Sequence, residues 1–175
     1  MKTTLLAAAL ALPFAAGAAF AAGSNEESAP SKPHCKSTQV YDEKTNKCVD
    51  PQESHLDVDT LYQTVRSLAH HGRYDDARGV LAAMPADDDR TLTYKGFVAR
   101  KLGDMDGAMK HYRRALVINP ANVLARSYMG QGFVEQGQID LAMEQLRAIR
   151  AHGGSGSWAE ASLRTAIATG QTFSY

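Results

Sequence analysis

The sequence predicts an all-α protein made of three antiparallel helical hairpins and one further helix near the C-terminus. The leading observation is a six-residue pattern (Gly, any residue, a large apolar residue, Asp, any residue, Ala) that begins at Gly72, Gly103 and Gly137. The intervals are 31 residues (103 − 72) and 34 residues (137 − 103), and recurrence at such a period indicates a repeat architecture. Apolar residues at helical spacing flank the pattern. Each copy is therefore expected to form the turn between the two helices of a hairpin.

The middle unit shows why these residue types favour a hairpin. Gly103 can adopt the left-handed conformation that ends a helix, and Asp104 follows at a position suited to capping the next helix. Pro120 ends that second helix, because proline cannot continue the backbone hydrogen bonding. Gly96 and Ala108 are small, so the two helices can approach each other closely.

This unit resembles a tetratricopeptide repeat. Counting from Asp89 as the first of 34 positions, the family's preferred small, bulky and Pro positions hold Gly96, Ala99, Ala108, Tyr112, Ala115 and Pro120. The first unit is three residues short and the third has Gly154 where Pro is usual. These two units keep Leu61, Leu68, Ala77, Leu81 and Met84, and Gly130, Phe133, Ala142, Leu146 and Ile149, respectively. The resemblance covers about residues 56–154 and implies a short right-handed α-solenoid that binds other proteins.

The chain before the repeats has the features of a leader and a linker. Lys2 is followed by an apolar run from Leu5 to Phe20, interrupted by Pro13, and a small-residue site ends at Ala21. A membrane span needs about 20 apolar residues, so an anchor is the alternative, but the Ala-rich run, Pro13 and the cleavage site favour a signal peptide. We expect cleavage after Ala21 and export, most simply to a bacterial periplasm.

The expected organisation has five parts. They are a signal peptide (1–21), a flexible linker with a two-cysteine hairpin (22–54), a helical domain (55–170) with repeats at about 56–88, 89–122 and 123–154 and a capping helix at about 157–169, and a tail (171–175). Ser157 and Glu160 have the spacing of a capping box at the start of the last helix. The tail is expected to be loose.

Charge argues against two classes of partner. The chain has 19 basic and 19 acidic residues, so removing Lys2 with the leader leaves 18 − 19, a formal charge of −1. A neutral chain has no bulk attraction for nucleic acid or anionic membrane. We predict neither a nucleic-acid partner nor stable membrane insertion after signal cleavage.

The only two cysteines are Cys35 and Cys48, and a disulfide is their expected state in an oxidising compartment. The segment between them can pair as two short strands around a polar turn, stabilised by about 3 kcal/mol from loop closure. One interpretation is a sugar-binding hairpin, similar to cysteine-stapled hairpins of some carbohydrate-binding domains, with Tyr41 as the platform. The favoured alternative is an exposed spacer or protein contact, separate from the helices, so that reduction leaves the helices intact.

Residues suited to catalysis or metal binding form no recognisable motif. His70 and His71 are adjacent on a helix and so point about 100° apart. Asp87, Asp88 and Asp89 precede a helix, where negative charge favours the helix dipole, whereas three consecutive carboxylates rarely converge on a metal. We therefore predict no catalytic residue, no metal site and no cofactor.

In tetratricopeptide arrays the first helices of successive hairpins line a concave groove, and the resemblance places nine residues there. They are Tyr62, Arg66, Thr93, Phe97, Arg100, Lys101, Gln131, Val134 and Glu135. The three cations make the middle of this groove basic, so we expect a partner segment with negative charge and an apolar contact at Phe97. Solvation of the surface is the alternative role for each cation.

Three classes of function follow. The leading one is a non-enzymatic adaptor of the bacterial envelope that binds a peptide segment or protein in the groove. The second is a carbohydrate or cell-wall binder that uses the cysteine hairpin, with the repeats as a spacer. The third, an enzyme, has the least support.

Overall fold

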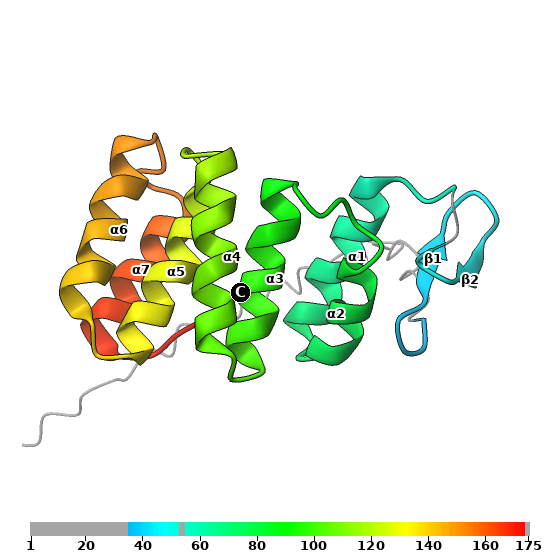
Figure 1. The fold of residues 1–175 in the computed structure, drawn as a ribbon, viewed down its shortest axis with the longest axis horizontal. Coiled ribbons are helices and arrows are strands. Elements are labelled where there is room, and N and C mark those ends of the chain that lie inside the picture. The colour runs from blue at the N-terminus through cyan, green and yellow to red at the C-terminus, as the bar shows by residue number, and fades with distance from the viewer. Residues whose placement is uncertain (1–34, 53–54, 174–175) are drawn as a thin grey trace, which may run out of the picture. The chain divides into compact units, whose positions relative to one another are not determined.

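The computed structural model describes residues 35–52 and 55–173, so the predicted signal peptide and the first part of the linker lie outside the described residues. Within them the chain forms a two-stranded sheet followed by seven helices (Figure 1). The elements are β1 (Val40–Asp42), β2 (Lys47–Val49), α1 (Val58–His70), α2 (Tyr74–Leu81), α3 (Asp89–Lys101), α4 (Met105–Ile118), α5 (Val123–Glu135), α6 (Ile139–Ala151) and α7 (Trp158–Thr169). The predicted all-α class, with three hairpins and a terminal helix, is confirmed.

The recurring pattern forms the turns inside the hairpins. Gly103, between α3 and α4, has a φ of +89°, a left-handed value that glycine adopts without strain, and Gly72 and Gly137 have similar values. Asp104 then caps α4 by accepting a hydrogen bond from the backbone N–H of Gly107 at 2.9 Å. Asp88 caps α3 in the same way, so this acidic segment acts as a helix start.

Small residues set the distance between α3 and α4. A Cβ atom on Gly96 would lie 2.5 Å from the ring of Tyr112, which is closer than atoms can pack. Ala108 and Tyr112 on α4 are fully buried. The close approach inferred from these small residues is thus present, and the Tyr112 ring fills the space beside it.

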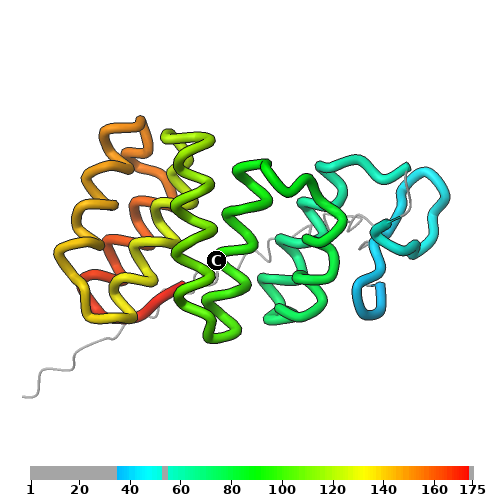
Figure 2. Tube along the Cα trace, viewed as in Figure 1, coloured from blue at the N-terminus to red at the C-terminus, as the bar shows by residue number. Residues whose placement is uncertain are grey.

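The helices stack in chain order (Figure 2). The first helices of the three hairpins contact one another, α1 with α3 and α3 with α5, whereas the second helices α2, α4 and α6 make no extensive contact with each other among the described residues. We call α1, α3 and α5 the inner row. Helix α7 packs on α5 and α6 and so covers the last hairpin.

Aromatic side chains connect the hairpins along the inner row. The ring of Tyr94 in α3 lies 5.5 Å from that of Tyr62 in α1 and 6.2 Å from that of Tyr128 in α5, and Tyr128 lies 6.2 Å from Trp158 in α7. Edge-on aromatic pairs at these distances are favourable beyond the area that they bury. The row is therefore held by one continuous set of ring contacts.

The cysteine hairpin is joined by a Cys35–Cys48 disulfide, and its two strands pair antiparallel with Tyr41 opposite Cys48. Val40 is fully buried and belongs to the same apolar core as the helices. Arg73, at the start of α2, donates hydrogen bonds to the carbonyl oxygens of Cys35 (3.2 Å) and Ser37 (2.7 Å). The hairpin therefore packs on α1 and α2, which corrects the expectation of a separate, solvent-exposed spacer.

Helix α7 begins as the sequence suggests, with one difference. The hydroxyl of Ser157 accepts a hydrogen bond from the backbone N–H of Glu160 at 3.3 Å. The carboxylate of Glu160, however, accepts from the N–H of Gly156 and from Arg150.

None of the helices in the described part of the chain is both long enough and apolar enough to cross a bilayer.

Candidate binding face

All nine residues expected in the groove lie on the inner row, but burial separates them into two groups. Tyr62, Arg66 and Lys101 are partly buried and Glu135 is exposed. The other five are buried: Thr93, Phe97, Arg100, Gln131 and Val134. The structure brings the nine residues onto three neighbouring helices, yet only part of the set reaches the surface.

Phe97 is a core residue. Its side chain is fully buried, and its ring lies 4.7 Å from that of Tyr128 and 6.0 Å from that of Tyr94. The expected apolar contact between Phe97 and a partner is therefore not available on this surface. The physical reason is that α3 is packed between α1 and α5, so the side of α3 assigned to the groove partly faces a neighbouring helix.

Arg100 is also internal. Its side chain is fully buried, and its Nη1 atom donates to Oε1 of Glu135 at 2.5 Å. A buried cation needs such a partner, because the loss of hydration is costly. Burial raises the pKa of the neighbouring Tyr112 hydroxyl well above its ordinary value, and Arg100 offsets part of that effect. The charge of Arg100 is thus compensated inside the protein.

Lys101 and Arg66 are the cations of the set that remain near the surface. The ammonium group of Lys101 lies 5.7 Å from the centre of the Phe97 ring. Burial, followed by the charge of Arg100, lowers the pKa of Lys101. Arg66 donates a hydrogen bond to Gln63 on the same helix at 3.3 Å. A negatively charged group beside Lys101 would therefore favour its charged form.

The C-terminal segment returns to the inner row instead of remaining loose. After α7 ends, the backbone N–H of Phe173 donates to Oε1 of Gln131 at 2.7 Å, and the hydroxyl of Thr172 donates to Oε1 of Glu135 at 2.6 Å. Both acceptors are on α5 and both belong to the expected groove set. Thr172 and Phe173 are partly buried.

Gln131 connects this contact to the interior. Its side chain is fully buried, and its amide Nε2 lies 3.4 Å from the hydroxyl of Ser127, which in turn lies 3.1 Å from the hydroxyl of Ser162 in α7. The amide is thus oriented from within, leaving its oxygen to accept the N–H of Phe173. A buried acceptor without a donor is costly, so this position calls for an N–H group.

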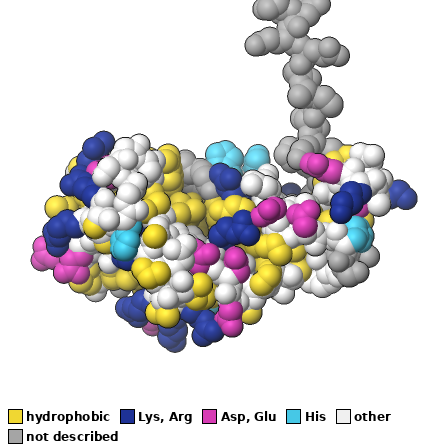
Figure 3. Space-filling model, turned by 90° about the horizontal axis from the view of Figure 1, so that it is seen from above, with side chains coloured by type: hydrophobic (Ala, Val, Ile, Leu, Met, Phe, Trp, Pro, Cys, Tyr) yellow, Lys and Arg dark blue, Asp and Glu magenta, His cyan; other side chains and the backbone are white. Residues whose placement is uncertain are grey.

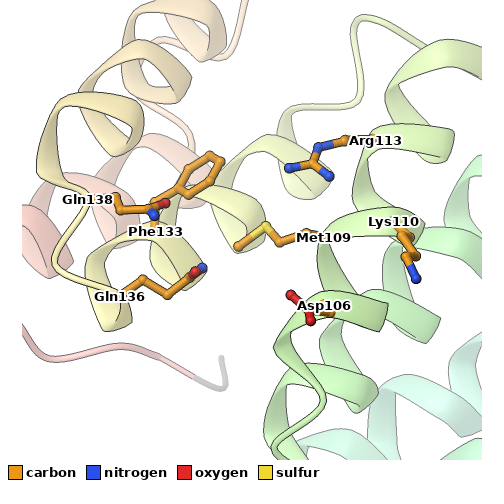
Figure 4. Close-up of a pocket in the computed structure, with 7 residues that line it drawn as sticks. All are labelled: Asp106, Met109, Lys110, Arg113, Phe133, Gln136 and Gln138. Atoms are coloured by element: carbon orange, nitrogen blue, oxygen red, sulfur yellow. The ribbon is translucent and has the colours of Figure 1, made fainter.

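A second surface feature is a pocket of 230 Å³ between α4, the C-terminal end of α5 and the turn that follows α5 (Figure 4). It is lined by Asp106, Met109, Lys110, Arg113, Phe133, Gln136 and Gln138. Its lining mixes charges of both signs, and the described residues contain no group of His, Cys, Asp and Glu side chains placed to hold a metal ion.

The charges on the face seen in Figure 3 are interspersed. Basic and acidic side chains alternate with apolar ones instead of forming one patch of a single sign. Among the described residues, several pair with one another at the surface, including Arg78 with Asp75 and Arg114 with Asp87. This agrees with the absence of net charge in the sequence.

Comparison with known proteins supports the repeat assignment. Residues 96–137 match a family model described as a TPR repeat, which spans the α3–α4 hairpin turn and α5. The hairpins form a tetratricopeptide-like fold. A crystal structure of PcrH in complex with the chaperone binding region of PopB is similar to this tetratricopeptide-like chain, with a TM-score of 0.51 at 20% sequence identity. The match covers 65% of this chain and 96% of that chain. No curated protein matches the sequence.

Sequence reasoning missed Thr172, Phe173 and Arg73. Thr172 and Phe173 follow Gly170, which ends α7 with a φ of +74° and turns the chain away from the helix axis. An aromatic residue shortly after a helix-ending glycine was the available signal. Arg73 had no signal, because its partners are backbone carbonyls more than 30 residues away in the chain.

Proposed function

We propose that this protein is an exported, non-enzymatic adaptor of the bacterial envelope that binds an extended segment of another protein along the inner row. The tetratricopeptide-like fold supports a protein-binding role. PcrH, which shares that fold, was crystallised with the chaperone binding region of PopB, a segment of another protein. For this chain, we propose the inner row as the surface that binds such a segment.

The observation that carries the proposal is the contact between Gln131 and a main-chain N–H from outside the repeats. The buried amide oxygen of Gln131 accepts the backbone N–H of Phe173 at 2.7 Å. Recognition of main chain by a side chain fixed within the fold is suited to extended segments of varied sequence. A partner segment would meet this acceptor in the same way.

The proposed partner carries negative charge. Arg100 is buried and bonded to Glu135, whereas Arg66 and Lys101 lie nearer the surface, where their positive charge would attract an acidic segment to the inner row. Charges near a binding surface raise the rate of association more than they slow dissociation, and salt weakens them. The attraction is therefore a property of two positions and not of the whole chain.

The test compares three single variants of the chain that starts at residue 22 in the capture of envelope proteins. Lys101→Glu reverses a charge on the inner row, Lys110→Glu makes the same change on α4 as a control, and Tyr41→Ala removes the proposed sugar platform of the cysteine hairpin. We expect Lys101→Glu alone to weaken capture. For the identified partner, it should lower the association rate and make that rate less sensitive to salt.

Tyr41→Ala is preferable to deletion of the hairpin, because Val40 is part of the core and its loss would disturb the helices. If Tyr41→Ala abolishes capture and Lys101→Glu has no effect, the inner row is not the binding surface. The carbohydrate or cell-wall alternative would then replace the adaptor proposal.

A further inference from the structure

The last described residues of the chain lie on the inner row without being part of a helix or strand. Gly170 ends α7 in a left-handed conformation, with a φ of +74°, and residues 171–173 then have no regular secondary structure. In Figure 1 this segment leaves α7 and runs toward the region of α4 and α5, and the hydrogen bonds of Thr172 and Phe173 place it on α5. A segment without regular secondary structure thus already occupies the proposed binding surface.

The first contact is made by a hydroxyl group. The side chain of Thr172 donates to Oε1 of Glu135 at 2.6 Å. That same carboxylate oxygen accepts from the buried guanidinium of Arg100, which holds Glu135 in place from the core side. A fixed carboxylate is a strong acceptor for a hydroxyl donor. An apolar residue at position 172 would not make this hydrogen bond, and Glu135 would keep only its bond to Arg100.

The second contact is made by the next residue and involves main chain. The N–H of Phe173 satisfies the buried oxygen of Gln131, and Phe173 is itself a partly buried residue. The position after the hydroxyl residue therefore combines a main-chain donor with a large apolar side chain. Together the two residues define a pattern, a hydroxyl-bearing residue followed by an aromatic one.

We propose, building on the adaptor function, that the inner row recognises this pair in an extended partner segment. Thr172 and Phe173 occupy the site formed by Glu135 and Gln131, here called the tail site, until such a segment displaces them. The tail is a competitor of modest strength. A short tether supplies an effective concentration on the order of millimolar. A partner segment displaces it by making further contacts, of which the negative charge attracted by Lys101 is one.

The first experiment tests whether Thr172 and Phe173 occupy the tail site in solution. Hydrogen exchange of the Phe173 amide is measured by NMR in the chain that starts at residue 22. We expect exchange at least about tenfold slower than in an unstructured peptide, because the N–H is bonded to Gln131. Thr172→Val should remove most of this protection, and Gln171→Ala, an exposed neighbour, should not. Exchange at the unstructured rate in the parent chain would overturn the proposal.

The second experiment tests which peptide sequences bind the tail site. A library of random peptides is selected against a chain ending at Gly170, which lacks residues 171–175 but keeps α1 to α7. We expect enrichment of Ser or Thr followed by Phe, Tyr or Trp. The enriched peptides should bind this shortened chain at least about tenfold more tightly than the chain with its tail, because the tail lowers the fraction of molecules whose tail site is free to bind.

The outcomes separate this proposal from the function on which it rests. Enriched peptides that lack the hydroxyl–aromatic pair, or that bind both chains equally, overturn the inference and leave the adaptor function standing. If no peptide is enriched by a shortened chain that melts as the parent does, both fall.

Discussion

Arg100 shows how neighbouring residues decide the role of a single side chain. It is at a position that the repeat family directs toward a groove, but its guanidinium is fully buried and bonded to Glu135. Burying a cation costs several kcal/mol, and the carboxylate of Glu135 offsets part of that cost, while the Nε and Nη2 atoms of Arg100 are buried without a hydrogen-bond partner among the described residues. Arg100 therefore orients Glu135 and does not itself steer a partner. Lys101, the next residue, keeps its ammonium closer to the surface.

Ala108 and Lys110 provide a test of the helical phase of α4. Ala108 is fully buried against α3, whereas Lys110 is exposed. Ala108→Leu should reduce the free energy of unfolding by about 1–3 kcal/mol, because the added methyl groups have no space. Lys110→Leu, which introduces the same side chain, should have little effect. The measurement is thermal unfolding of both variants, and equal melting temperatures would contradict the packing of α4.

At the scale of elements, the cysteine hairpin caps the start of the helical stack. Val40 contributes to the common core, and the side chain of Thr38 lies against Gly79 of α2, where an added Cβ atom would be 2.3 Å away. Two short strands alone are marginally stable in water. The disulfide and the helices therefore stabilise the hairpin together, and the hairpin in turn covers the first repeat.

Reduction of the disulfide should destabilise the first repeat. Closure of a loop of this length by a disulfide contributes about 3 kcal/mol of stability. Loss of the disulfide would loosen the hairpin, and with it the contact of Val40 with the core and the hydrogen bonds of Arg73 to the hairpin. We expect a lower melting temperature under reducing conditions, with amide exchange in α1 and α2 rising more than in α6. A Cys35→Ser/Cys48→Ser chain should show the same loss without reductant. Identical melting curves before and after reduction would restore the separate-spacer interpretation.

Acid should weaken two specific elements. The hydroxyl of Thr45 and then the backbone N–H of Lys44 lower the pKa of Asp42 in the hairpin below its ordinary 3.8. At the start of α7, the N–H of Gly156 and then Arg150 lower the pKa of Glu160 below its ordinary 4.5. A lowered folded pKa means that the ionised carboxylate stabilises the fold above the unfolded pKa, and that this contribution is lost as pH falls through the folded pKa.

The corresponding measurement is thermal unfolding over a series of pH values from 7 down to about 2. The melting temperature should fall once the pH drops below the ordinary values of 3.8 and 4.5. Asp42→Asn and Glu160→Gln should each lower the melting temperature at neutral pH and flatten its decline in acid. Glu144→Gln, an exposed change on α6, serves as the control. A melting temperature independent of pH in this range would refute the assignment.

At the scale of the whole molecule, the contacts that matter for function join distant parts of the chain. Thr172 contacts Glu135, which is 37 residues earlier, and Arg100 contacts Glu135 across 35 residues. Glu135 on α5 therefore joins the C-terminal segment to α3 within the inner row. Thr172 and Phe173 thereby become part of the proposed binding surface.

Export is the remaining proposal at this scale. The leader features of residues 1–21 lead us to expect a mature chain that begins at Ala22 and contains the Cys35–Cys48 disulfide. Intact-mass analysis of protein recovered from the periplasm of an expressing bacterium measures both at once. Retention of residues 1–21, or two free thiols in the exported protein, would count against this proposal. A chain expressed without residues 1–21 should remain in the cytoplasm and serves as the control.

Much of the fold could be predicted because it depends on local patterns. Gly103 needs a left-handed conformation, Asp104 caps the helix that follows it, and Gly96 leaves space for Tyr112, all within one hairpin. The helical class, the repeat units and the placement of nine residues on one row follow from such short-range rules.

The accessibility of those residues was a matter of tertiary structure. The sequence by itself determined that Phe97, Arg100, Gln131 and Glu135 lie on first helices, because spacing along a helix specifies a face. Only the packing of α3 between α1 and α5 placed Phe97 and Arg100 inside, and only the return of the chain after α7 brought Thr172 to Glu135. Burial and pairing depend on elements far away in the sequence, whose approach no local pattern encodes.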